Sequence, residues 1–365
     1  MKETNYLNKI FTVPYLDSIQ HSKHFQSILS SKTILSSKSY KSVISDLYQE
    51  LQATHRNEYF YKNELLNSLL IQNRKISSCS ALTELSVAKS KTDMIFVDEN
   101  DVGIVYEIKT ELDTLNRLES QIQDYYKAFP YIYVVTSSNH LHQLEQALEE
   151  TSVGIIELTG DREFVHRKEA TCNTNNLSHD VLFRILRKKE FESIVLKYFK
   201  ELPDVSDFVY YRTCFGLLEN LDIVLFQKEV MSCLRKRNLV QNADDFIKNV
   251  PYELCFYGYF SKKYRKKWHA LRSFLDTKID VPKKKQSRNQ WIELFFLDVH
   301  KQNIVIRTLD LYIKRSVLSV LFVLYKALFI GHFLVCLEWL GRIGQVKLLY
   351  KSSVPTVPCV LMYII

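Results

Sequence analysis

Thr92-Asp93-Met94-Ile95-Phe96-Val97 and Tyr106-Glu107-Ile108-Lys109 are the two stretches that decide the fold of this chain. Each stretch reads as a β-strand, because both are rich in apolar residues that favour extended backbone. Side chains alternate between the faces of a strand, so Glu107 and Lys109 point one way while Ile108 points into the core. Residues 98–101 have the composition of a turn, so we expect residues 93–98 and 102–109 to form a hairpin. This arrangement brings an acid of the first strand close to an acid and a lysine of the second.

Two carboxylates and an amine at converging strand ends suit the hydrolysis of a phosphodiester with a hard metal ion. The carboxylates hold the cation, and the lysine sits beside the water that the cation activates. An isolated Glu-x-Lys in a surface hairpin is also typical of a salt bridge, which contributes little to stability. Asp93, Glu107 and Lys109 are therefore candidate catalytic residues, and Asp93 and Glu107 are candidate metal ligands.

The segments around this hairpin predict an α/β unit. A helix is expected from Asp113 or Thr114 to residue 129, and Tyr131–Thr136 is a continuous apolar run, which is typical of a buried parallel strand. Residues 140–150 predict another helix, and Gly154–Leu158 and 163–166 predict a closing hairpin. Upstream, residues 56–76 predict a helix that carries Glu64, and residues 82–87 predict a short strand that carries Glu84. This order predicts a three-layer α/β core with a mixed sheet, followed by a mostly α-helical region.

The length and the composition bound the class of protein. The chain has 365 residues, which suits about two domains. Its formal net charge of +8 suits a polyanionic partner but does not require one. The seven cysteines form no Cys-x-x-Cys pair, so we expect free thiols in a reducing cytoplasm. We divide the chain into a helical N-terminal extension (1–55), an α/β domain (56–170), a helical and basic region (171–290) and an apolar tail (291–365).

Two features of the second half admit more than one interpretation. Residues 317–340 are apolar over a length that would span a bilayer, but Lys326, His332 and Glu338 interrupt them, so a buried or interface helix is favoured. The basic stretch within residues 261–288 is either a solvated face or a contact for the DNA backbone, with Tyr264 and Trp268 interleaved. The candidate nucleic-acid contacts in that stretch are Lys262, Lys263, Arg265, Lys266 and Lys267.

The ordered residues of the α/β unit resemble the PD-(D/E)XK nuclease superfamily. Thr92-Asp93 matches the first half of its motif, with Thr92 where a proline often stands, and Glu107-Ile108-Lys109 matches the second half. Gln121-Ile122-Gln123-Asp124-Tyr125 is similar to the Gln-x-x-x-Tyr helix motif of the RecB-like branch. The longer run from Tyr106 to Tyr125 is closer still to a bacterial domain family of unknown function that is named after a myxobacterial locus tag. The resemblance covers residues 60–190.

This resemblance implies a restriction-endonuclease-like core and a role for each matching residue. Asp93, Glu107 and the carbonyl of Ile108 would bind Mg²⁺ or Mn²⁺. Glu64 is the first candidate for a further carboxylate ligand, and Glu84 is its rival. Lys109 would orient or deprotonate the attacking water. Gln121 and Tyr125 would hold the lysine, the metal-bound waters or the DNA backbone, and Arg117 would contact a phosphate.

Three functions follow from these observations. The first is a Mg²⁺- or Mn²⁺-dependent endonuclease that acts on DNA, with RNA as a further candidate substrate, in phage defence or mobile-element biology. The second is a non-catalytic module on the same fold that binds nucleic acid or a protein, although such a module has no need of all of Asp93, Glu107 and Lys109. The third is a membrane-associated protein through residues 317–340. We favour the first, in a cytoplasmic protein, and the sequence leaves open whether the chain forms a homodimer.

Overall fold

The computed structural model describes residues 5–19, 22, 25, 38–264, 267–279, 347–350 and 360–363. The chain divides into two compact units, Met1–Val281 and Pro282–Ile365. In the second unit the described residues are strands β9 (Lys347–Tyr350) and β10 (Val360–Tyr363), which pair antiparallel. The apolar segment 317–340 and the candidate contacts Arg265 and Lys266 lie outside the described residues. None of the helices in the described ranges is long and apolar enough to cross a membrane.

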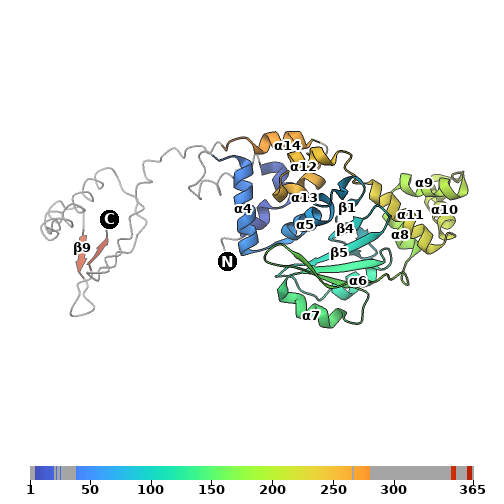
Figure 1. The fold of residues 1–365 in the computed structure, drawn as a ribbon, viewed down its shortest axis with the longest axis horizontal. Helices are drawn as coiled ribbons and strands as arrows, with labels where there is room; N and C mark the ends of the chain where they lie inside the picture. Colours follow the sequence, from blue (N-terminus) through green and yellow to red (C-terminus); the bar gives the residue numbers. More distant parts are fainter. Residues whose placement is uncertain are drawn as a thin grey trace. The chain divides into compact units, whose positions relative to one another are not determined.

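A six-stranded mixed sheet is the centre of the first unit (Figure 1). In spatial order the strands are β1 (Ser80–Leu82), β4 (Met94–Val97), β5 (Gly103–Lys109), β6 (Tyr131–Thr136), β7 (Gly154–Leu158) and β8 (Phe164–Lys168). β5, β6 and β7 run parallel, and the pairs β1–β4, β4–β5 and β7–β8 are antiparallel. The predicted hairpin is confirmed, with Met94 opposite Tyr106. The apolar run Tyr131–Thr136 is a parallel strand, as predicted, and it pairs with β5.

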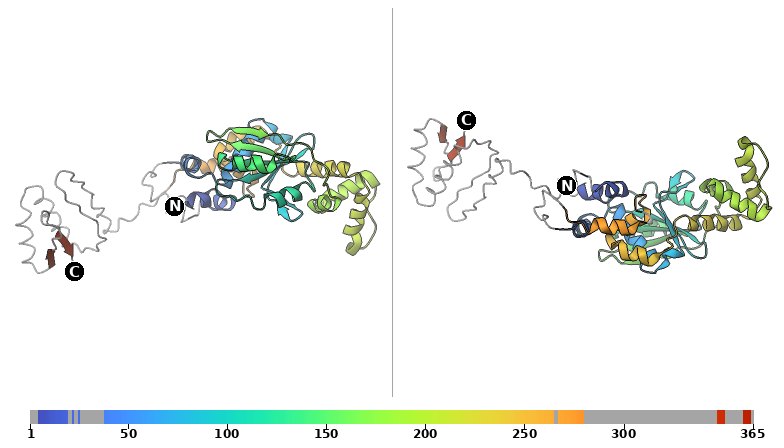
Figure 2. Two further views of the ribbon diagram at one scale, coloured as in Figure 1. Left: turned by 90° about the horizontal axis from the view of Figure 1, so that it is seen from below. Right: turned by 90° about the horizontal axis from the view of Figure 1, so that it is seen from above.

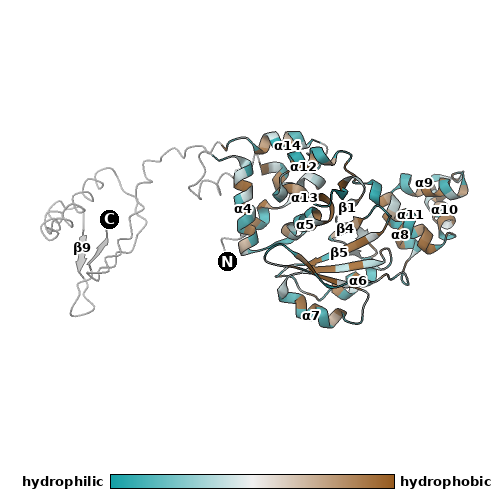
Figure 3. Cartoon of the chain, viewed as in Figure 1, coloured by the Kyte–Doolittle hydropathy of each residue, from teal (hydrophilic) through white to brown (hydrophobic). Residues whose placement is uncertain are grey.

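Alternating side chains of the strands divide the interior into two apolar cores, one on each face of the sheet. Met94 and Phe96 belong to the first core, whereas Ile95 and Val97 belong to the second. Helices cover both faces, which gives the predicted three layers, and Figure 3 shows the hydrophobic residues concentrated on the strands. The first core is shared with α4 (Tyr40–Thr54), α5 (Glu58–Leu66), α12 (Ala243–Asn249), α13 (Cys255–Phe260) and α14 (Trp268–Leu275), and the second with α6 (Leu118–Tyr125), α7 (Ser138–Leu148), α8 (His179–Ile185), α9 (Lys188–Phe199), α10 (Asp207–Glu219) and α11 (Ile223–Lys236).

Segments from both ends of the first unit pack against one face of the sheet. α13 contacts α5 and α2 (Val13–Ser18), and α14 contacts α4. The predicted boundaries after residues 55 and 170 therefore lie inside one compact unit. The described residues from 171 to 279 are mostly helical, as predicted, and α9 and α10 project past the sheet in all three views (Figures 1 and 2). The remaining short elements are α1 (Asn5–Ile10), η2 (Asn67–Ile71), η3 (Lys75–Ser77), β2 (Ser86–Val87), β3 (Ser90–Lys91) and η4 (Tyr252–Leu254).

Two local differences from the sequence prediction have clear causes. The helix expected from Asp113 or Thr114 begins only at Leu118, because Asp113 Oδ2 accepts hydrogen bonds from the Thr110 backbone N at 2.8 Å and from Thr110 Oγ1 at 2.7 Å. Asp113 thus closes the turn after β5 and caps no helix. The strand expected over residues 82–87 is broken into β1 and β2, because Glu84 has a left-handed backbone with φ 56°.

Two glycines provide a test of how tightly the sheet is packed. An added Cβ at Gly154 would lie 2.3 Å from a ring carbon of Tyr133 and 2.7 Å from the backbone N of Ala170. We expect Gly154→Ala to lower the free energy of unfolding by about 1 to 3 kcal/mol, because the backbone atom has nowhere to move. The control is Gly216→Ala in α10, where an added Cβ meets nothing within 4 Å and should raise the free energy of unfolding by roughly 1 kcal/mol. Urea unfolding followed by circular dichroism measures both, and a Gly154→Ala protein as stable as wild type would contradict this packing.

Candidate functional site

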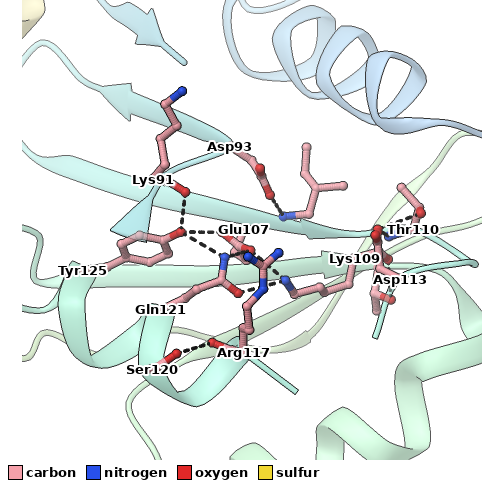
Figure 4. A network of polar contacts seen from close by, with 12 residues as sticks. Lys91, Asp93, Glu107, Lys109, Thr110, Asp113, Arg117, Ser120, Gln121 and Tyr125 are labelled. Carbon is pink, nitrogen blue, oxygen red and sulfur yellow. Dashed lines mark hydrogen bonds and ion pairs between the residues drawn. The ribbon is translucent and has the colours of Figure 1, made fainter. Parts of the chain in front are cut away.

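The structure brings Asp93, Glu107 and Lys109 together at one end of the sheet (Figure 4). Asp93 directly precedes β4, and Glu107 and Lys109 close β5, which pairs antiparallel with β4. Asp93 Oδ2 accepts a hydrogen bond from the backbone N of Ile108 at 2.8 Å. The N–H and C=O groups of a strand residue face the same neighbouring strand, so the carbonyl of Ile108 also faces the side of Asp93.

Glu107 is buried, with 1% of its surface exposed, and its carboxylate receives several hydrogen bonds. Oε1 accepts from Lys109 Nζ at 2.7 Å and from Gln121 Nε2 at 2.5 Å, and Oε2 accepts from the Tyr125 hydroxyl at 2.7 Å. Lys109 Nζ also donates to Gln121 Oε1 at 3.0 Å. We call Glu107, Lys109, Gln121 and Tyr125 the Glu107 network. Burying a charge without such partners is costly, so these four side chains depend on one another.

Helix α6 supplies half of this network. Gln121 and Tyr125 stand four residues apart and therefore share one face of the helix, which explains the Gln-x-x-x-Tyr spacing. Burial, and then the charge of Glu107, raise the pKa of Tyr125, so its hydroxyl keeps its proton at neutral pH. The same hydroxyl lies 2.8 Å from the carbonyl oxygen of Lys91 in β3. α6 thus connects the Glu107 network to the short β2–β3 hairpin.

Three carboxylates form a second group beside Asp93. Oxygens of Glu58, Glu84 and Asp93 all lie within 4.8 Å of one another, and we call these residues the acidic cluster. Glu58 stands in the first turn of α5, Glu84 lies between β1 and β2, and Asp93 directly precedes β4. The ammonium group of Lys62 is ion-paired with Glu58 and with Glu84, at 3.0 Å from Glu84 Oε1. Oxygen ligands of this kind are those that Mg²⁺ and Mn²⁺ prefer.

The backbone of Glu84 is strained. Its φ of 56° is a left-handed conformation, which costs a non-glycine residue about 1 to 2 kcal/mol. Backbone hydrogen bonds hold the turn, from Glu84 N to Thr92 O at 3.0 Å and from Thr92 N to Leu85 O at 3.0 Å. Such strain concentrates at functional sites, and here it accompanies the placement of the Glu84 carboxylate in the acidic cluster.

The electrostatics of Asp93 reflect its crowded position. Burial, followed by the negative charge of Glu107, raises the pKa of Asp93 from 3.8 to about 7, against the hydrogen bond from Ile108 and the charge of Lys62. Asp93 is therefore partly protonated near neutral pH when no cation is present. A divalent cation among these oxygens would favour the charged carboxylate.

Glu64, the first sequence candidate for a further metal ligand, lies in another environment. Its Oε1 accepts a hydrogen bond from the Tyr48 hydroxyl at 2.6 Å, and its Oε2 accepts one from the Tyr252 hydroxyl at 2.5 Å. The structure therefore favours the rival, Glu84, as a member of the acidic cluster. Glu58 is a member of the acidic cluster that was not predicted from the sequence. Its signal is local, since it follows the N-cap Asn57 and stands four residues before Lys62 at the start of α5.

The candidate nucleic-acid contacts that lie within the described residues are exposed. Arg117 stands at the N-terminus of α6, and Figure 4 shows its side chain beside Gln121. Lys262, Lys263 and Lys267 are also exposed, whereas Tyr264 and Trp268 are only 6% and 5% exposed and belong to the first core. The interleaved aromatic rings are thus core residues and offer no stacking surface for bases. Among the described residues of this stretch, the exposed candidates for a phosphate contact are therefore the lysines.

Comparisons with known proteins identify one family. The family model for bacteriophage P4 protein cII matches residues 51–254, more than half of the chain, and this range contains both the Glu107 network and the acidic cluster. No curated protein matches the sequence significantly. Among solved structures, the chain is similar to the SPO1766 protein of unknown function from Silicibacter pomeroyi, at 10% identity and a TM-score of 0.23, over 37% of this chain and 94% of that chain. A structural likeness of this size supports no inference about fold or function.

The raised pKa of Asp93 predicts how stability changes with pH in the absence of divalent cations. The folded protein holds the Asp93 proton more tightly than the unfolded chain does, so this contribution is complete below about pH 4 and is lost as the pH rises through about 7. We expect Asp93→Asn to gain roughly 4 kcal/mol in unfolding free energy relative to wild type as the pH rises between these values. Urea unfolding with EDTA at a series of pH values measures this, and two parallel stability curves would show that Asp93 titrates normally.

Proposed function

We propose that this chain, which belongs to the bacteriophage P4 protein cII family, is a Mg²⁺- or Mn²⁺-dependent nuclease that cleaves DNA. The observation that carries the proposal is the placement of Lys109 at the end of the sheet where Asp93 and the other carboxylates of the acidic cluster lie. The side chain of Lys109 is 8% exposed, and it is hydrogen-bonded to Glu107 and Gln121. A lysine held in this way next to a set of carboxylates is suited to phosphodiester hydrolysis. The PD-(D/E)XK resemblance of the same residues supports the proposal.

The residues present fit a hard divalent cation. All donors of the acidic cluster are carboxylate oxygens, and their mutual distances of up to 4.8 Å would allow one ion to contact all of them. Burial and the charge of Glu107 raise the pKa of Asp93, and a bound cation would favour its charged form. Glu58, Glu84 and Asp93 would hold the ion, with Glu107 and the Ile108 carbonyl on its β5 side. When bound, such an ion activates water and stabilises charge on the attacked phosphate.

The side chains of the Glu107 network have distinct tasks in this proposal. Lys109 directs an N–H group toward the attacking water and offers positive charge to the phosphate. Glu107 and Gln121 fix the position of that ammonium group through bonds of 2.7 Å and 3.0 Å. Tyr125 keeps its proton and donates a hydrogen bond to Glu107, which holds the carboxylate in a single orientation. Gln121 and Tyr125 are therefore positioning residues for Lys109 and Glu107.

The surroundings of the site suit a polyanionic substrate. Exposed Lys89 and Lys91 on the β2–β3 hairpin and exposed Arg117 on α6 lie on elements that adjoin the Glu107 network. These positive charges and the net charge of +8 favour binding to the phosphate backbone. Membership of a bacteriophage protein family supports a role in mobile-element biology. The proposal places the protein in the cytoplasm, where its DNA substrate would be.

One observation favours a second function, a nucleic-acid-binding module without catalysis. Both oxygens of Glu107 already accept hydrogen bonds from Lys109, Gln121 and Tyr125, and Glu107 is outside the acidic cluster. In this alternative the network only stabilises the fold, and binding to DNA depends on salt without any cleavage. Titration calorimetry with Mn²⁺ separates the two functions, because the binding module needs no metal.

Two substitutions test the nuclease directly. We expect Asp93→Ala and Lys109→Ala each to lower cleavage of DNA by about a hundredfold or more, because one removes a metal ligand and the other removes the group that orients water. The assay uses plasmid, linear and single-stranded DNA, and RNA, each with Mg²⁺ or Mn²⁺. Circular dichroism and salt-dependent DNA binding should remain as in wild type. A wild-type protein that leaves every substrate intact with both metals would refute the proposal.

A matched pair of glutamates on one helix tests which carboxylate completes the metal site. Glu58→Gln should weaken Mn²⁺ binding by about tenfold or more, because it removes a charged oxygen ligand from the acidic cluster. Glu64→Gln should leave the affinity for Mn²⁺ unchanged and lower only the melting temperature, because Glu64 is bonded to Tyr48 and Tyr252. Calorimetric titration gives both affinities. A larger loss of affinity in Glu64→Gln than in Glu58→Gln would mean that the ligand assignment is reversed.

A further inference from the structure

We infer that Lys62 is an internal counter-ion of the acidic cluster, which holds Glu58 and Glu84 together before a metal binds and competes with the metal for these two carboxylates. The inference rests on the proposed function, since it concerns the same metal site. Lys62 lies outside the motif formed by Asp93 and Glu107-Ile108-Lys109. Its effect on metal binding can be measured without measuring DNA cleavage.

The position of Lys62 is unusual for a lysine. It stands on α5 one turn after Glu58, and it is only 5% exposed. A buried ammonium group is costly unless acids surround it. Lys62 meets this need through ion pairs with Glu58 and with Glu84.

The partners of Lys62 are two of the carboxylates that a metal would use. Lys62 Nζ is ion-paired with Glu58 and lies 3.0 Å from Glu84 Oε1, and its charge acts on Asp93 as well. One ammonium group therefore serves all members of the acidic cluster. A divalent cation bound by Glu58 and Glu84 would lie close to this ammonium group, so the like charges would repel at short range.

Lys91 offers a natural comparison. Its Nζ lies 3.2 Å from Glu84 Oε2, so it pairs with the same carboxylate as Lys62. Its side chain is 59% exposed, whereas that of Lys62 is 7% exposed. Water and salt screen the exposed charge far more than the buried one. Only the loss of the Lys62 charge should therefore change the affinity of the cluster for a cation.

The test measures Mn²⁺ binding to the full-length chain by titration calorimetry, with wild type, Lys62→Met and Lys91→Met at one pH and ionic strength. Methionine keeps the apolar stem of the buried lysine and removes its charge. We expect Lys62→Met to lower the dissociation constant for Mn²⁺ by about tenfold, and Lys91→Met to change it by less than about twofold. Lys62→Gln is the second variant, and it should show the same gain if Lys62→Met folds poorly.

Thermal unfolding supplies a readout that needs neither cleavage nor DNA. Without metal, Lys62→Met should melt below wild type, because its carboxylates repel one another. Saturating Mn²⁺ should raise its melting temperature by more than it raises that of wild type. Equal Mn²⁺ affinity in wild type and both Lys62 variants, or weaker binding in the variants, would overturn the counter-ion role while the metal site stands. Wild-type protein that binds no Mn²⁺ would overturn the metal site and the counter-ion role together.

Discussion

The buried carboxylate of Glu107 is the constraint on which the site and much of its surroundings depend. A charge with 1% exposure requires donors, and these come from Lys109 on the same strand and from Gln121 and Tyr125 on α6. This requirement fixes where α6 lies along the sheet. Asp124 of α6 in turn accepts hydrogen bonds from Lys89 N at 3.2 Å and Ser90 Oγ at 2.8 Å, and so holds the β2–β3 hairpin. The chain then enters β4 at Asp93, so one buried charge indirectly positions the second acid.

The Glu107 network and the acidic cluster lie side by side because helices cover both faces of the sheet. The Glu107 network lies on the face of α6, and α5 brings Glu58 from the helices of the opposite face. Asp93 directly precedes β4, and from there it lies close to both the Glu107 network and the other acids of the acidic cluster. Lysines balance both groups, Lys109 in the network and Lys62 in the cluster. The end of the sheet thus combines strong negative charge with closely held positive charge, which is an arrangement suited to exchanging cations.

The sequence predicted those parts of the fold and the site that depend on local patterns. Alternation and turn composition predicted the β4–β5 hairpin, and the continuous apolar run predicted the parallel strand β6. The choice among glutamates was beyond local patterns, because the direction of a helical side chain depends on how the helix is rotated in the fold. Long-range bonds such as that from Asn63 Nδ2 to the Tyr252 carbonyl at 3.0 Å set the position of α5, and no short motif encodes them. The left-handed turn at Glu84 and the burial of Trp268 were hidden for the same reason.

The way in which α5 is held has a consequence for the order of synthesis. Asn63 Oδ1 accepts a hydrogen bond from the backbone N of Phe256, a residue 193 positions later, and the Tyr59 hydroxyl donates to the carbonyl of Glu253 at 3.0 Å. A growing chain that has emerged only through α11 already contains Asp93, Glu107 and Lys109, but it lacks the segment that seats the helix carrying Glu58. We therefore expect the acidic cluster to be completed only after the last helices of the unit have been synthesised. For the proposed nuclease, this order would delay assembly of the metal site until the unit is complete.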